Sequence, residues 1–164
     1  MKILVSSCLL GEDVRFDGAN SSIAYNPRLR FADKEIFMDL MCENEIYSFC
    51  PEVEGGLSIP RIPAQITSFE KPFKVTNENG EDVTINFLMG AKKTLDLCLS
   101  EGIKVALMKA KSPSCGNLQT YDGTFSETLV DKPGMTAKLL MENGIEVFNE
   151  TQLKELKSFI KKNK

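Results

Sequence analysis

The 164-residue sequence contains no histidine. Without this residue the chain cannot build a Ser-His-Asp or Cys-His nucleophile pair, nor a histidine-ligated zinc or non-haem iron site. Acid–base chemistry must therefore come from carboxylates, lysine, tyrosine, serine or a bound ion.

Long apolar runs and an excess of positive charge are also missing. No window is long enough for a membrane-spanning helix, and the start of the chain lacks the long apolar stretch of a signal peptide. Lys and Arg number 20 against 23 Asp and Glu, so the net charge is −3 and no general field attracts a nucleic-acid backbone. We therefore expect a cytoplasmic protein with no membrane partner and no sign of nucleic-acid binding.

Apolar segments typical of strands alternate with amphipathic segments typical of helices. The predicted strands are 2–7, 45–49, 103–110 and 145–148, and the predicted helices are 32–42, 84–101, 133–143 and 151–162. Segments 73–76 and 82–84 are expected to form a hairpin around Asn79-Gly80. This order predicts an α/β fold over residues 1–164 as a single domain, with a mainly parallel sheet, helices on both faces and a small β-hairpin insertion.

The cysteines, 5 in number, fall into two groups. Cys42 and Cys98 lie in predicted helices, where a cysteine is usually a small buried hydrophobe. Cys8, Cys50 and Cys115 each follow a predicted strand, in loops that contain glycine or proline. The carboxyl ends of parallel strands meet at one edge of a sheet, so these thiols are expected to meet there and form a soft-metal site. An odd number of cysteines in a reducing compartment argues against a disulfide framework.

Several ligands suit three thiolates. Zinc usually takes four ligands, and neither histidine nor a nearby CxxC pair supplies the fourth. An iron–sulfur cluster accepts scattered cysteines, and a cubane held by three of them would leave one iron open as a Lewis acid. From spacing alone, a cluster, a zinc ion and three isolated buried thiols all stay open.

Polar residues flank the same cysteines. Glu52 is placed to move protons beside the site, although a solvent-facing loop carboxylate explains it as well. Ser112 and Ser114 precede Cys115 and are also explained by turn chemistry. Positive charge near the thiols would favour thiolates and offset an anionic cluster, and the candidates are Arg15, Arg61, Lys109 and Lys111. No G-x-G-x-x-G or P-loop motif indicates a dinucleotide or ATP.

Four longer patterns are spread along the chain. They include Val5-Ser6-Ser7-Cys8-Leu9-Leu10-Gly11, Cys50-Pro51-Glu52, Ser112-Pro113-Ser114-Cys115-Gly116 and Thr136-Ala137. In this order the patterns resemble the signature segments of the thiouracil desulfidases, and they span nearly the whole chain. The resemblance implies a Rossmann-like α/β domain with a [4Fe–4S] cluster on Cys8, Cys50 and Cys115.

The resemblance also implies a reaction and roles for residues. The sulfur of 2-thiouracil, or of a related thiolated nucleobase or nucleoside, would bind the open iron, and water would replace sulfur without net redox change. Glu52 would assist the attacking water, and Ser112 would position or protonate the base. Arg15, Arg61 and Ser114, beside the same cysteines, are the candidates for substrate binding.

Some positions depart from the family pattern, and other functions stay open. Phe16 stands where tyrosine is common, Gln65 where an acid is frequent, and 132–135 replace a more usual glycine-containing helix start. These departures affect the expected substrate preference and leave the expected cluster ligands unchanged. The alternatives are a binding module for a nucleotide or protein partner, stabilised by a cluster or zinc, and a sulfur carrier in RNA thiolation with a persulfide on Cys115.

Overall fold

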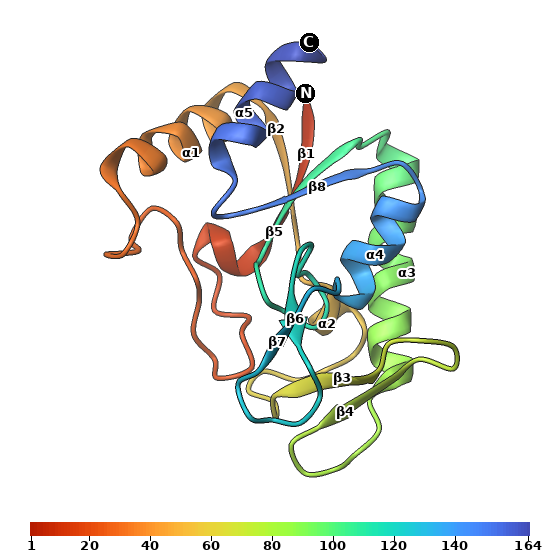
Figure 1. Cartoon of the computed structure of the whole chain (residues 1–164). Coiled ribbons are helices and arrows are strands. Elements are labelled where there is room, and N and C mark those ends of the chain that lie inside the picture. Colours follow the sequence, from red (N-terminus) through yellow and green to blue (C-terminus); the bar gives the residue numbers. More distant parts are fainter.

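A parallel sheet in the order β2-β1-β5-β8 runs through the molecule (Figure 1). The computed structural model describes residues 1–164. The strands of the sheet are β1 (Lys2–Ser6), β2 (Glu45–Phe49), β5 (Val105–Met108) and β8 (Glu146–Asn149). Each neighbouring pair is parallel, which confirms the predicted mainly parallel sheet.

Side chains of the central strands alternate between two apolar layers. Ile3 and Val5 of β1 pack in the layer beneath α1 (Phe31–Glu43) and α5 (Leu153–Lys162). Leu4 points to the opposite layer, beneath α3 (Thr84–Glu101) and α4 (Met135–Glu142). A strand buried on both faces is a continuous apolar run, as segment 3–5 is. Helices therefore cover both faces, as predicted.

The chain changes its winding direction at β1. It passes from β1 through α1 to β2 on one side, then crosses the sheet through α3 to β5 on the other side of β1. In open α/β sheets, ligands bind in the crevice beyond the carboxyl ends of the strands at such a reversal. The loops that contain Cys8, Cys50 and Cys115 all start at this point.

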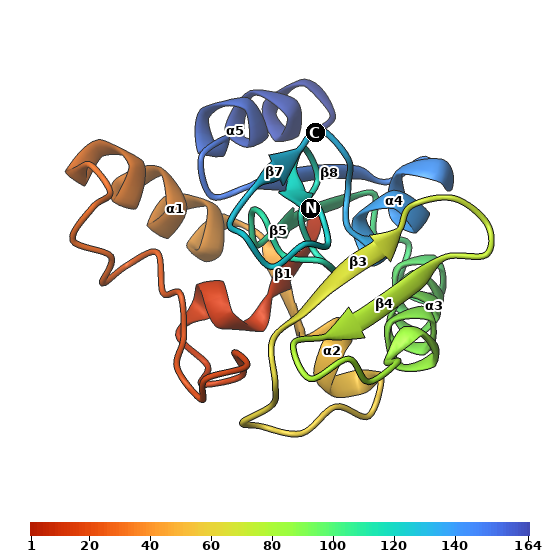
Figure 2. The ribbon, with the colours of Figure 1, turned by 60° about the horizontal axis from the view of Figure 1, so that its bottom comes forward.

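Two small antiparallel sheets lie at the end of the molecule toward which β1 runs (Figures 1 and 2). They are β3 (Ala64–Ser68) with β4 (Lys74–Asn77), and β6 (Thr120–Tyr121) with β7 (Leu129–Val130). The predicted hairpin around Asn79-Gly80 is present: Asp82 bridges Thr76, and the N–H of Val83 donates to the carbonyl of Val75 at 3.0 Å. Segment 82–84 is too short to count as a strand because α3 starts at Thr84, and β4 also pairs with β3, which the sequence does not predict.

The predicted burial of Cys42 is wrong. This residue is exposed near the end of α1, where burial is expected, because α1 buries Phe37 and Leu40 on its other side. Cys98 in α3 is 1% exposed, as predicted. None of the helices combines the length and the apolar character that crossing a membrane requires.

Candidate functional site

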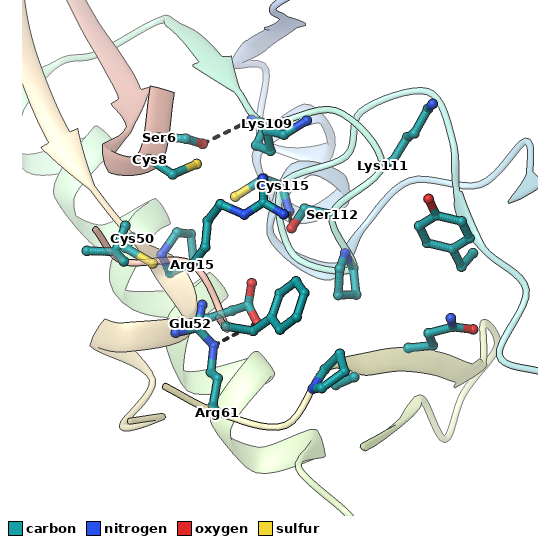
Figure 3. Close-up of a pocket in the computed structure, with 18 of the residues that line it drawn as sticks. Ser6, Cys8, Arg15, Cys50, Glu52, Arg61, Lys109, Lys111, Ser112 and Cys115 are labelled. Carbon is teal, nitrogen blue, oxygen red and sulfur yellow. Dashed lines mark hydrogen bonds and ion pairs between the residues drawn. The ribbon is translucent and has the colours of Figure 1, made fainter. Parts of the chain in front are cut away.

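Three cysteines meet where β2, β1 and β5 end (Figure 3). Cys8 lies in the short 3-10 turn η1 (Ser7–Leu10) after β1, and Cys50 separates β2 from the one-turn helix α2 (Pro51–Glu54). Cys115 lies in the loop after β5. All three line one cavity of about 530 Å³. The structure thus brings together three thiols that the strand-end argument expects to meet.

Close packing between α2 and α3 fixes the position of Cys50. A Cβ atom on Gly90 of α3 would lie 2.0 Å from the carbonyl oxygen of Pro51. A Cβ atom on Gly55 would lie 2.1 Å from the carbonyl oxygen of Asn86. Only glycine permits this approach, so two glycines allow α3 to support the residues that follow Cys50.

The two serines before Cys115 have different roles. The Ser112 hydroxyl accepts the backbone N–H of Cys115 at 3.0 Å and that of Ser114 at 3.2 Å. Because it accepts both bonds, its own proton is free to donate into the cavity that Ser112 lines. Ser114 is 1% exposed, does not line the cavity, and shares a hydrogen bond of 2.9 Å with Thr136. The expected substrate contact of Ser114 therefore does not fit the geometry.

Glu52 and Arg61 form an ion pair on the cavity wall (Figure 3). Arg61 Nε lies 3.4 Å from Glu52 Oε1, and the side chains are 7% and 18% exposed respectively. Burial raises the pKa of the Glu52 carboxyl, and Arg61 only partly opposes this effect. A carboxyl with a raised pKa beside a cluster of nucleophiles is a candidate for proton transfer.

The environment of the thiols suits a cationic ligand. Burial raises the pKa of Cys8 to about 11 and also raises the pKa of Cys50 and Cys115. For Cys8, the nearby charges of Lys109 and Arg15 lower the pKa, but burial has the larger effect. Buried thiols of this kind give up their protons when a metal binds them. The donor set therefore fits an iron–sulfur cluster.

Three thiol donors at one cavity are the type of ligand that an iron–sulfur cluster uses. Each thiolate on a cubane binds a different iron, so the ligands of a cluster stand further apart than those of one ion. In Figure 3 the sulfur atoms of Cys8, Cys50 and Cys115 point toward a common space.

Two other candidates, Arg15 and Lys109, also line the cavity. Arg15 donates a hydrogen bond of 2.8 Å to the hydroxyl of Ser21. Lys109 Nζ lies 2.5 Å from a carboxylate oxygen of Glu150. Both cations are therefore held in place rather than free in solvent.

Backbone strain is concentrated at this cavity. The non-glycine residues with positive φ are Lys111 (65°), Phe125 (57°) and Glu127 (61°), and all of them line the cavity. Such angles cost free energy and persist where the surrounding structure imposes them, commonly at functional sites.

One wall of the cavity includes residues for which the sequence predicts no catalytic or ligand role. That wall includes Gln65 of β3 and Phe125 in the loop between β6 and β7. The sequence marks Gln65 only as a departure from the family pattern, and Asp122-Gly123 is a motif typical of the tip of a hairpin. Nothing in the sequence shows that this tip would reach β3.

Comparisons with known proteins agree with this architecture. A family model described as 2-thiouracil desulfurase matches residues 3–152. The uncharacterized protein YbbK of Bacillus subtilis (strain 168) is 34% identical over 160 residues, which cover 94% of this chain and 99% of YbbK. A solved structure of the [4Fe-4S]-dependent thiouracil desulfidase TudS is 41% identical, with a TM-score of 0.84, and the match covers 98% of this chain and 97% of that one.

Proposed function

Because the chain belongs to the 2-thiouracil desulfurase family, we propose that it releases sulfide from 2-thiouracil or from a related thiolated nucleobase or nucleoside. Water supplies the oxygen of the product, so that C=S and H₂O become C=O and H₂S, with no electrons gained or lost. The observation that carries the proposal is the shared cavity of Cys8, Cys50, Cys115 and Glu52.

In this proposal, Cys8, Cys50 and Cys115 hold a [4Fe–4S] cluster. The support is that each thiol comes from the end of a different strand, and that the similar protein TudS is [4Fe-4S]-dependent. When bound, the cluster supplies an iron without a protein ligand, which acts as a Lewis acid toward a soft thiocarbonyl sulfur.

The neighbouring side chains handle protons and orientation. Glu52 takes the proton of the attacking water, and Arg61 holds the carboxylate in place through the 3.4 Å ion pair. Ser112 donates its free hydroxyl proton to the heterocycle. Arg15 lines the cavity, is held by Ser21, and supplies a cation that can bind the polar edge of the substrate.

The whole chain, residues 1–164, acts in this proposal as one domain. The support is that the cavity takes its walls from segments between Ser6 and Glu127, spread over most of the sequence. We place the protein in the cytoplasm, where a reducing environment keeps cysteine thiols available to bind a cluster.

The test is an assay of 2-thiouracil on protein reconstituted with iron and sulfide without oxygen, in water enriched in ¹⁸O. We expect one sulfide for each uracil formed, ¹⁸O in the uracil, and no need for an electron donor or acceptor. The Cys42→Ser variant, altered at an exposed thiol outside the cavity, should behave like the wild type. Uracil without ¹⁸O, or turnover only with a reductant, would contradict the proposal.

A further inference from the structure

Gln65 joins the strand β3 to the hairpin tip across the cavity. Side chains alternate along a strand, so Ile66 enters the core at 1% exposure, while the neighbouring Gln65 faces the cavity. Gln65 Oε1 accepts two backbone N–H groups, from Gly123 at 3.0 Å and from Phe125 at 3.2 Å. A single amide oxygen therefore ties two segments that lie far apart in the sequence.

The hairpin tip is shaped for this contact. The N–H of Asp122 donates to the carbonyl of Thr128 at 2.9 Å and closes the loop 122–128. Gly123 has a φ of 93°, and a Cβ atom there would lie 2.6 Å from the carbonyl oxygen of Ile66. Glycine thus permits the tip to touch β3. Phe125, at the tip, holds a φ of 57° that is unfavourable for a bulky residue.

The unfavourable φ of Phe125 is explained if the function of the site needs its ring in one fixed position. The side chain is half-buried and lines the cavity together with Phe16 and Phe49, and Phe16 is the more exposed at 37%. Aromatic rings bind planar heterocycles by stacking, which is tolerant of their substituents. A ring held in one plane also sets the direction in which an exocyclic sulfur points.

We propose that Gln65 is a positioning residue that holds Phe125 as the wall on which the planar ring of the substrate stacks. This inference rests on the proposed function and specifies how the site recognises its substrate. Gln65 acts through Phe125, because its oxygen is used by the loop backbone.

The test is a double-mutant cycle on the cluster-loaded enzyme with Gln65→Leu, Phe125→Ala and the double variant. We expect each single change to raise KM for 2-thiouracil by about tenfold, the range that loss of one stacked base predicts. Iron content and kcat should change little. The double variant should be no worse than Phe125→Ala alone, since Gln65 then has no ring to position.

Two further variants separate positioning from general stability. Gln65→Glu keeps an oxygen that accepts both N–H groups and should retain the wild-type KM. Gln119→Leu removes a similar amide that donates to Asp131 outside the cavity, and should also leave KM unchanged. If the increases in KM caused by Gln65→Leu and by Phe125→Ala multiplied in the double variant, the inference would be overturned. A wild-type KM in Gln65→Leu would also overturn it.

Binding of 2-thiouracil to the cluster-loaded Glu52→Gln protein gives a readout that needs no turnover. The dissociation constant should rise by about tenfold when Gln65→Leu or Phe125→Ala is added. If the wild type released no sulfide, the proposed function would fail, while this measurement would still decide whether Gln65 and Phe125 form a binding wall. An unchanged dissociation constant would overturn the inference even in an active enzyme.

Discussion

Arg61 reaches Glu52 through Nε, 3.4 Å from Oε1, on the wall of a cavity that also contains three thiols. The pair links two loops, because the Arg61 backbone N–H also donates to the carbonyl of Phe16 at 2.7 Å. Arg61 thus orients the carboxylate while burial keeps its pKa high. Such a carboxyl is suited to exchange a proton with water during the reaction.

Glu52→Gln should remove turnover and spare the cluster. The amide keeps the shape of the side chain but cannot take a proton, so we expect kcat for sulfide release to fall by about 10²- to 10⁴-fold. Iron content should stay at the wild-type level. Glu54→Gln, an exposed change in the same helix α2, is the matched control. Full activity in Glu52→Gln would remove this residue from the mechanism.

Ser112→Ala should weaken both the loop and the reaction. It leaves the N–H groups of Ser114 and Cys115 without an acceptor, at a cost of about 1–3 kcal/mol. We expect lower iron occupancy after reconstitution and slower turnover, with recovery of occupancy in Ser112→Thr. Ser114→Ala, whose hydroxyl faces Thr136, should leave KM and kcat near wild type. Equal loss of activity in both alanine variants would contradict these assignments.

Gly90→Ala should destabilise the protein although alanine favours helices. The new Cβ would lie 2.0 Å from the Pro51 carbonyl oxygen, so α2 must shift. We expect urea unfolding to show a loss of about 1–3 kcal/mol, as overpacking usually causes, together with poor cluster reconstitution. Ser100→Ala, exposed on the same helix, should stay within about 0.5 kcal/mol of wild type. A stabilised Gly90→Ala protein would show that α2 does not need this approach.

The carboxylate of Glu101 should make stability depend on pH. Hydrogen bonds from Lys2 at 3.1 Å and from the Tyr47 hydroxyl at 2.9 Å lower the pKa of Glu101 below its ordinary value of 4.5. A lowered pKa in the folded state stabilises the fold above pH 4.5, and this contribution is lost as pH falls through the folded pKa. Glu101→Gln should therefore be less stable than wild type at pH 7, and the difference should shrink in acid. Urea unfolding of both proteins at pH 7 and in acid measures this difference in stability. A difference that does not change with pH would contradict the prediction.

The sequence was sufficient for features set by local patterns. The apolar run 3–5 identifies a strand buried on both faces, and α3 has the predicted bounds because Gly102, with a φ of 70°, ends it. Because the sheet is parallel, the strand-end positions of Cys8, Cys50 and Cys115 were enough to expect one shared edge.

The remaining features depend on contacts between distant residues. The pairing of β4 with 82–84 follows from the local Asn79-Gly80 turn, whereas its second partner, β3, is decided by packing and was not predicted. Whether Ser112 or Ser114 faces the cavity depends on how the loop turns. The bond from Phe125 to Gln65 joins positions 60 apart, and no local pattern encodes it.

The most direct test of the central claim is the amount of iron and acid-labile sulfide per chain after reconstitution without oxygen. We predict about four of each for the wild type and for Cys42→Ser, as a cubane requires. Serine in place of Cys8, Cys50 or Cys115 should remove the cluster and the release of sulfide from 2-thiouracil. A full complement of iron and sulfide in any of those three variants, or sulfide release without iron, would contradict the account.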